Sequence, residues 1–142
     1  MKRALFAALL IVACTSSAAP PLKGELFVLQ SIDGIPLPAP YAEDRLVPFR
    51  VLADTIALLT STSGERRARV EIDNIGTTRF SREAFDYVRN GDRMEISFRC
   101  PPDADCIRPP HLAGTVTTEA YLVDMSVISR SPLLYRHMGL AE

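Results

Sequence analysis

Cysteine is the first residue type in this sequence whose spacing suggests chemistry. Cys100 and Cys106 lie at the two ends of a short segment rich in proline and aspartate. In an oxidising compartment this pair is predicted to form a structural disulfide, which would stabilise the loop by about 2–2.5 kcal/mol. The alternative is a metal site that adds His111 and Asp103 or Asp105. Zinc requires four ligands and the spacing is not CxxC, so we predict no metal.

A second group of candidates is Arg66, Arg67 and Arg69. Guanidinium groups suit phosphate and carboxylate, so these three side chains are candidate contacts for an anionic ligand. The competing interpretation is that the arginines of this region pair with Glu71 and Asp73 across a sheet. Exposed pairs of that kind contribute less than about 1 kcal/mol each.

The histidines do not indicate a catalytic site. His111 follows two prolines, and His137 lies near the end of the chain. Neither belongs to a GxSxG or HExxH motif. We therefore expect no enzymatic activity and no cofactor, although a triad assembled from distant residues stays open.

Composition limits the class of protein. The chain has 142 residues, of which 47% are hydrophobic, with 16 basic and 17 acidic side chains. These values fit one globular domain and argue against a disordered chain and a nucleic-acid binder. No apolar run reaches the roughly 18 residues that a membrane-spanning helix needs.

The N-terminal segment has the pattern of an export signal. Lys2 and Arg3 precede an apolar run over residues 4–13, as in a secretory signal peptide. The run ends in Ile11-Val12-Ala13-Cys14, which resembles the lipobox of bacterial lipoproteins. That resemblance implies removal of residues 1–13 and attachment of lipid to Cys14, because several acyl chains anchor a protein stably. Ordinary cleavage before Ala19 is the alternative, and a buried N-terminal helix of a cytosolic protein is a further one.

Residues 14–24 are predicted to form a lipidated, flexible tether, because residues 15–21 are small, polar and contain proline. Ten extended residues reach at most about 33 Å. Thr15 after the cysteine, where enteric sorting rules place aspartate for the inner membrane, favours the periplasmic side of the outer membrane. A secreted or soluble periplasmic protein is the alternative location. Loss of Lys2 and Arg3 leaves 14 basic and 17 acidic side chains, or a net charge of about −3.

Residues 25–138 read as short strands, followed by a tail over residues 139–142. The clearest evidence is alternation of apolar and charged residues over 67–73 and 93–99, with Asn90-Gly91 as a hairpin signal. The prolines of residues 36–40 are expected to exclude regular pairing, and turns are expected at Ala53-Asp54, at Ser63–Glu65 and over residues 74–83. The predicted strands cover residues 25–32, 46–52, 55–62, 67–73, 85–89, 93–99, 112–118, 120–128 and 133–137.

Eight or nine strands with short connections predict an all-β antiparallel meander. A small closed or partly closed barrel would remove the exposed edges, and a two-sheet sandwich is the alternative. Residues 49–59 also have apolar positions at helical spacing, and residues 81–87 have room for one helical turn. We expect strand in the first segment.

The run over residues 25–38, with Asp33-Gly34-Ile35-Pro36-Leu37-Pro38 at its end, resembles the opening of small bacterial lipocalin-like lipoproteins. The resemblance extends loosely over residues 25–138, including the hairpin from Tyr87 to Phe98. It implies an antiparallel barrel. The chain has no tryptophan, so the Gly-x-Trp signature of lipocalins is absent, and the resemblance carries a fold further than an activity.

Together these features predict a lipid-anchored envelope protein that binds a small apolar ligand or a protein without catalysis. A structural or assembly role through protein contacts is the alternative, and a secreted inhibitor or hydrolase is the less favoured one. No nucleic-acid partner is expected.

Overall fold

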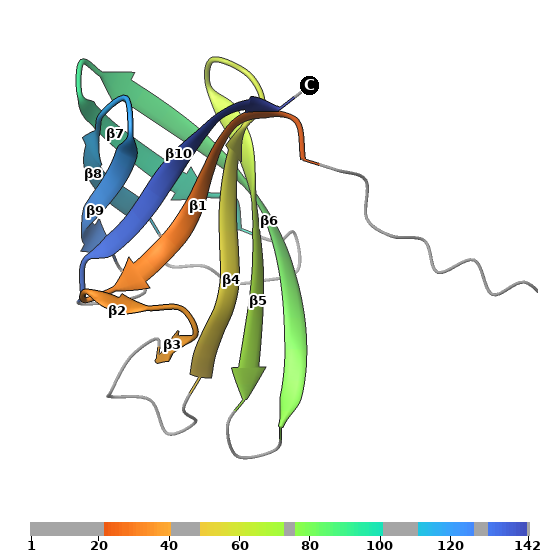
Figure 1. Cartoon of the computed structure of the whole chain (residues 1–142). Coiled ribbons are helices and arrows are strands. Elements are labelled where there is room, and N and C mark those ends of the chain that lie inside the picture. Colours follow the sequence, from red (N-terminus) through yellow and green to blue (C-terminus); the bar gives the residue numbers. More distant parts are fainter. Residues whose placement is uncertain (1–21, 41–48, 73–75, 101–110, 127–130, 142) are drawn as a thin grey trace, which may run out of the picture.

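The computed structural model describes residues 22–40, 49–72, 76–100, 111–126 and 131–141 (Figure 1). Ten β-strands make up the regular structure of these residues. In chain order they are β1 (Gly24–Ile32), β2 (Ile35–Pro36), β3 (Ala39–Pro40), β4 (Phe49–Leu58), β5 (Ser63–Ile72), β6 (Thr77–Asn90), β7 (Arg93–Phe98), β8 (His111–Val116), β9 (Ala120–Ser126) and β10 (Leu133–Ala141).

Eight of these strands form a closed antiparallel barrel. From β4 to β10 each strand pairs with the next along the chain. β1 closes the ring, because it pairs with β10 on one side and with β4 on the other (Figure 1). The predicted all-β meander and its closure as a barrel are therefore confirmed. Full closure leaves these pairings without the exposed edges that invite aggregation.

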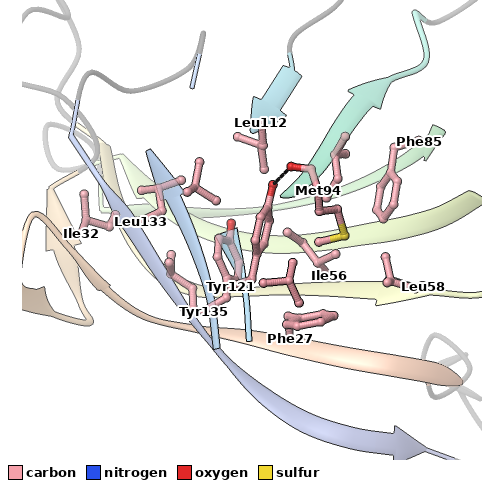
Figure 2. Close-up of a cluster of buried hydrophobic side chains, with 14 of the residues drawn as sticks. Phe27, Ile32, Ile56, Leu58, Phe85, Met94, Leu112, Tyr121, Leu133 and Tyr135 are labelled. Atoms are coloured by element: carbon pink, nitrogen blue, oxygen red, sulfur yellow. Dashed lines mark hydrogen bonds between the residues drawn. The ribbon is translucent and has the colours of Figure 1, made fainter. Parts of the chain in front are cut away.

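Alternation along the strands fills the barrel with side chains. Phe27 and Leu29 on β1 and Tyr121 and Val123 on β9 are buried, as the period of two requires. Figure 2 shows side chains from different strands converging on one core. Its fully or almost fully buried members include Phe27, Ile32, Ile56, Leu58, Phe85, Met94, Ile96, Leu112, Tyr121, Val123, Leu133 and Tyr135.

The turn expected at Ala53-Asp54 is wrong. β4 runs without interruption from Phe49 to Leu58 and pairs with β5 along its length, with a shift in register between Val51 and Ala53. Such a bulge bends a strand without ending it. Asp54 is instead a buried residue at the middle of the strand. The expectation of strand over residues 49–59 is confirmed, and the helical alternative is excluded.

The loop expected at Ser63–Glu65 is wrong as well, because β5 already begins at Ser63. Gly64 lies inside the barrel, where a Cβ would collide with the carbonyl oxygen of Ala57 and the ring of Phe85. This glycine therefore serves close packing rather than a turn. The chain reverses just before it, where the Thr60 side-chain oxygen accepts a hydrogen bond from the Ser63 backbone N–H at 3.0 Å.

β6 begins at Thr77, within a segment expected to be a turn. The reason is its partner, since residues 77–86 of β6 are in register with the whole of β5. Tertiary pairing overrides the local preference of the polar residues at the start of β6. This pairing also excludes the helical turn considered for residues 81–87.

The proline segment pairs more than expected, although only in two-residue pieces. β2 pairs with Ser31 and Ile32, and β3 pairs with Arg50 and Val51. The Leu37-Pro38 peptide bond between them is cis, and Leu37 packs against the core. At the other end of the chain β10 continues to Ala141, into the segment expected to be a tail.

Candidate functional site in the barrel interior

A buried ion pair lies inside the barrel, between β4 and β5. The side chain of Asp54 is fully buried, and that of Arg66 is 8% exposed. Arg66 Nε donates to Asp54 Oδ1 at 3.0 Å and Oδ2 at 2.9 Å, and its Nη2 donates to Oδ2 at 2.5 Å. Such a two-pronged contact is the strongest geometry that an arginine and a carboxylate form.

Other strands complete this network. The Tyr135 hydroxyl on β10 donates to Asp54 Oδ2 at 3.0 Å, passing over β1, which lies between β4 and β10. Arg66 Nη1 donates to Glu83 on β6 at 3.1 Å, and the guanidinium lies 5.5 Å from the ring centroid of Phe98. The hydrogen bonds of Asp54 and Arg66 thus link four strands of the barrel, β4, β5, β6 and β10.

Charge and hydrogen bonding indicate what the network does. The Asp54 carboxylate accepts bonds from both partners, and Arg66 faces two carboxylates. An anionic ligand at Arg66 would have to displace these contacts within a buried site, at a high desolvation cost. The arrangement therefore suits a cross-strand brace better than an anion-binding site.

The structure separates the three candidate arginines. Arg66 points inward, whereas Arg67 and Arg69 lie on the outer face of β5. Arg67 Nε donates to Glu65 at 2.6 Å, and Arg82 Nε on β6 donates to the other Glu65 oxygen at 2.6 Å. Burial raises the pKa of the Glu65 carboxyl, but the hydrogen bonds from Arg82 and Arg67 outweigh it and hold that pKa below its usual value.

Aromatic side chains occupy the space around the ion pair. Tyr121 and Tyr135 lie 6.0 Å apart between ring centroids, and Phe27 packs edge-on against Tyr121 at 6.1 Å. The Tyr121 hydroxyl donates to the carbonyl oxygen of Met94 at 3.3 Å, drawn as the dashed line in Figure 2. Burial raises the pKa of Tyr121, so this hydroxyl stays neutral.

The two histidines lie at opposite ends of the barrel. His111 begins β8, whereas His137 lies beside the turn that follows β8 and donates through Nδ1 to the carbonyl of Thr118 at 2.9 Å. The ring of His137 stacks on Phe27, and its Nε2 lies 3.3 Å from Glu25. The structure therefore does not bring the two imidazoles together. Within the described ranges no group of three His, Cys, Asp or Glu side chains is arranged to hold a metal ion.

A shallow depression lies on the outer face of β1, β9 and β10. It has a volume of about 360 Å³ and is lined by Gln30, Glu119, Ala120, Leu134 and Arg136. Next to it, the exposed side chains of Leu134 on β10 and Leu122 on β9 stand directly opposite each other. The leucine pair and the charged side chains of Glu119 and Arg136 form a small patch of mixed polarity.

Sequence reasoning missed both features. Asp54 has the residue type of a turn, although a single acid at an alternating position of an apolar strand is a usable signal for a buried charge. The depression could not be found, because its residues come from three strands that only the fold brings together.

The predicted lipidation site Cys14 and the second cysteine of the predicted disulfide, Cys106, lie outside the described residues. Both assignments stay predictions. The described part of the chain contains no helix long and apolar enough to span a membrane.

Comparison with known proteins returned no relative. No protein-family model matches the chain, and no curated protein or solved structure matches it. The resemblance to lipocalin-like lipoproteins is supported only by the fold, because an eight-stranded antiparallel barrel is consistent with a lipocalin-like fold.

Proposed function

We propose that this protein is a lipid-anchored lipoprotein of the bacterial cell envelope whose barrel is a non-catalytic binding module that contacts another protein. The main support for binding on the outer surface is the difference between the inside and the outside of the barrel. The inside holds a packed aromatic core and a buried ion pair, whereas the outer face of β9 and β10 presents Leu122 and Leu134.

The interior supports this choice by what it already contains. A barrel that holds an apolar ligand needs space lined by inward side chains. Here the inward side chains of Phe27, Phe85, Met94, Tyr121 and Tyr135 are fully buried against one another. A ligand in their place would disrupt native packing, which is as dense as a crystal of small organic molecules.

The outer face supports the proposal by its chemistry. Leu122 and Leu134 are directly opposite each other in the register of β9 and β10, with exposed fractions of 46% and 39%. Arg136 and Glu119 lie beside them at the rim of the depression. Apolar centres with charged rims are the usual anatomy of transient protein interfaces.

The anchor is tested by intact mass of the protein extracted from membranes. We expect a chain that begins at Cys14, carries acyl chains and lacks the thiol hydrogens of Cys100 and Cys106. The matched control is Cys14→Ser, which should be found without acyl chains and outside the membrane fraction. A mature N-terminus at Ala19 overturns the lipoprotein proposal.

The binding face is tested by a photo-crosslinking amino acid placed at Leu122 in cells. We expect one discrete crosslinked protein from Leu122 and none from the matched position Val88, which is 60% exposed on β6, on another side of the barrel. Equal crosslinking from both positions, or none from either, counts against a specific protein partner at this face.

A second candidate is a small amphipathic ligand in the depression, favoured by its volume and its mixed lining. Native mass spectrometry separates the two. Bound small molecules that are lost on denaturation, and that Leu134→Glu abolishes, would support the ligand. An unchanged mass under both conditions would favour the protein partner.

A further inference from the structure

One end of the barrel carries the point where the tether enters the domain. Gly24, the first residue of β1, is paired with Ala141 at the end of β10. It is also so close to β4 that an added Cβ would collide with the carbonyl oxygen of Leu58 and touch the Cα of Leu59 at 3.4 Å. Figure 1 shows the start of β1 (orange) beside the end of β10 (dark blue) at this end of the barrel. We call this region the entry end, defined by Lys23, Gly24, Leu59 and Leu140.

Two large apolar side chains flank this point of entry and are exposed. Leu59 directly follows β4 and is 47% exposed, and Leu140 on β10 is 82% exposed. The register brings the two strand ends together, because Glu25 is paired with Leu140 on one side and with Leu58, the residue before Leu59, on the other. Lys23, the residue directly before β1, is exposed.

We propose that the entry end docks on the surface of the bilayer that holds the acylated Cys14, with Leu59 and Leu140 inserted among the lipid headgroups. This inference rests on the proposed lipid anchor and adds an orientation of the barrel to it. An ammonium group such as that of Lys23 suits the phosphates of that surface, and leucine side chains suit its apolar boundary.

The length of the tether supports this orientation. The residues from Cys14 to Leu22 span at most about 26 Å when fully extended. A ten-residue strand such as β4 is about 33 Å long. The anchor therefore keeps the entry end within about 26 Å of the bilayer, which is less than the length of one strand.

Phe80 provides a matched control because its exposure is similar and its position is different. It is 78% exposed, and it is in register with Arg69 on β5, which is in register with Ala53 on β4. Ala53 is six residues before Leu59, which corresponds to about 20 Å along the strand. A side chain at Phe80 should therefore stay outside the bilayer.

The absence of tryptophan from the chain makes the test direct. Leu140→Trp and Phe80→Trp each give a protein with a single tryptophan, without background fluorescence. The acylated proteins are reconstituted into vesicles of phosphatidylethanolamine and phosphatidylglycerol, with and without bromine on the acyl chains. Intact mass of the same samples reports the acyl chains on Cys14.

We expect brominated lipid to quench Leu140→Trp at least about twofold more strongly than Phe80→Trp, with a blue shift of its emission. Leu59→Trp should behave like Leu140→Trp and replaces it if that variant does not fold. Equal quenching at both ends, or none, in a sample whose mass shows acylation overturns the docking and leaves the anchor intact. A mass without acyl chains overturns the proposed function and this inference with it.

Discussion

Two neighbouring arginines on opposite faces of β5 have different surroundings. Arg66 points into the barrel and shares the fully buried Asp54 carboxylate with Tyr135. Arg67, the next residue, lies on the outside and pairs with Glu65, which also binds Arg82, whose side chain is 61% exposed. The same residue type therefore forms a buried ion pair on one face and a partly exposed one on the other.

The contribution of an ion pair to the free energy of unfolding therefore depends on the face of the strand on which it lies. In water an ion pair loses little when it breaks, because solvent replaces the partner. Inside the barrel solvent cannot do so, and a charge left alone costs several kcal/mol. The inner pair should therefore matter for folding, whereas the outer one should respond mainly to pH.

The largest effect is expected from Asp54→Asn, which keeps the shape of the side chain and removes its charge. Arg66 then retains only Glu83 as a charged partner among the contacts described above. The free energy of unfolding should fall by about 3–5 kcal/mol, as for other broken buried pairs. Urea unfolding at neutral pH measures it. The control Asp86→Asn, on the exposed pair with Arg99, should leave the midpoint unchanged. An equal loss of unfolding free energy in both variants would contradict the proposed difference between buried and exposed ion pairs.

Tyr135→Phe should have the next largest effect. It removes the hydroxyl that donates to Asp54 at 3.0 Å and leaves the ring in the core. A hydrogen bond to a charged group contributes about 1.5–3 kcal/mol. Tyr121→Phe is the matched control, because its hydroxyl binds a neutral carbonyl at 3.3 Å and its loss should cost less. A larger loss from Tyr121→Phe would show that the charge of Asp54 is not what matters.

Gly64→Ala tests the packing of the inner face without changing a charge. The new methyl group would collide with the carbonyl of Ala57 and the ring of Phe85. Overpacking of this kind costs about 1–3 kcal/mol. Thermal unfolding, compared with Ala84→Gly at an exposed position opposite Glu65, measures it. An unchanged melting temperature for Gly64→Ala would mean that the inner face adapts more easily than its packing indicates.

The smallest effect is expected on the outer face, from Glu65→Gln. Because the folded chain holds the pKa of Glu65 below its usual value of 4.5, the carboxylate stabilises the fold fully above about pH 4.5. That contribution is lost as the pH falls through the lower folded pKa. The wild type should therefore exceed the variant in stability by less than about 1 kcal/mol at neutral pH, and the two should converge in acid. Urea unfolding as a function of pH decides it, and a difference that persists in acid would contradict a role for the charge.

The sequence was sufficient to predict an all-β fold, because apolar and polar residues alternate along its strands. Met94, Ile96 and Phe98 on β7 occupy every second position, and all three are buried as predicted. The Asn90-Gly91 signal correctly marked the hairpin of β6 and β7, although its two loop residues are Gly91 and Asp92, with a positive φ at Gly91.

Local signals failed where contacts distant in sequence decide the outcome. Asp54 resembles a turn residue until Arg66 and Tyr135 are placed beside it, and Gly64 resembles a loop residue until Phe85 covers it. The start of β6 is polar, and only its pairing with β5 makes it a strand. Such positions are set by neighbours from other strands, which no local window of sequence contains.

The seam between β1 and β10 has a consequence for the order of folding. Its ladder joins Gly24 to Ala141 and Ile32 to Leu133, so its partners are separated by most of the domain's sequence. Contacts between residues so far apart in the sequence form slowly, because a long loop must close before they add any stability. During synthesis β1 can pair with β4 early, whereas its pairing with β10, which closes the barrel, has to wait until the last strand has been made.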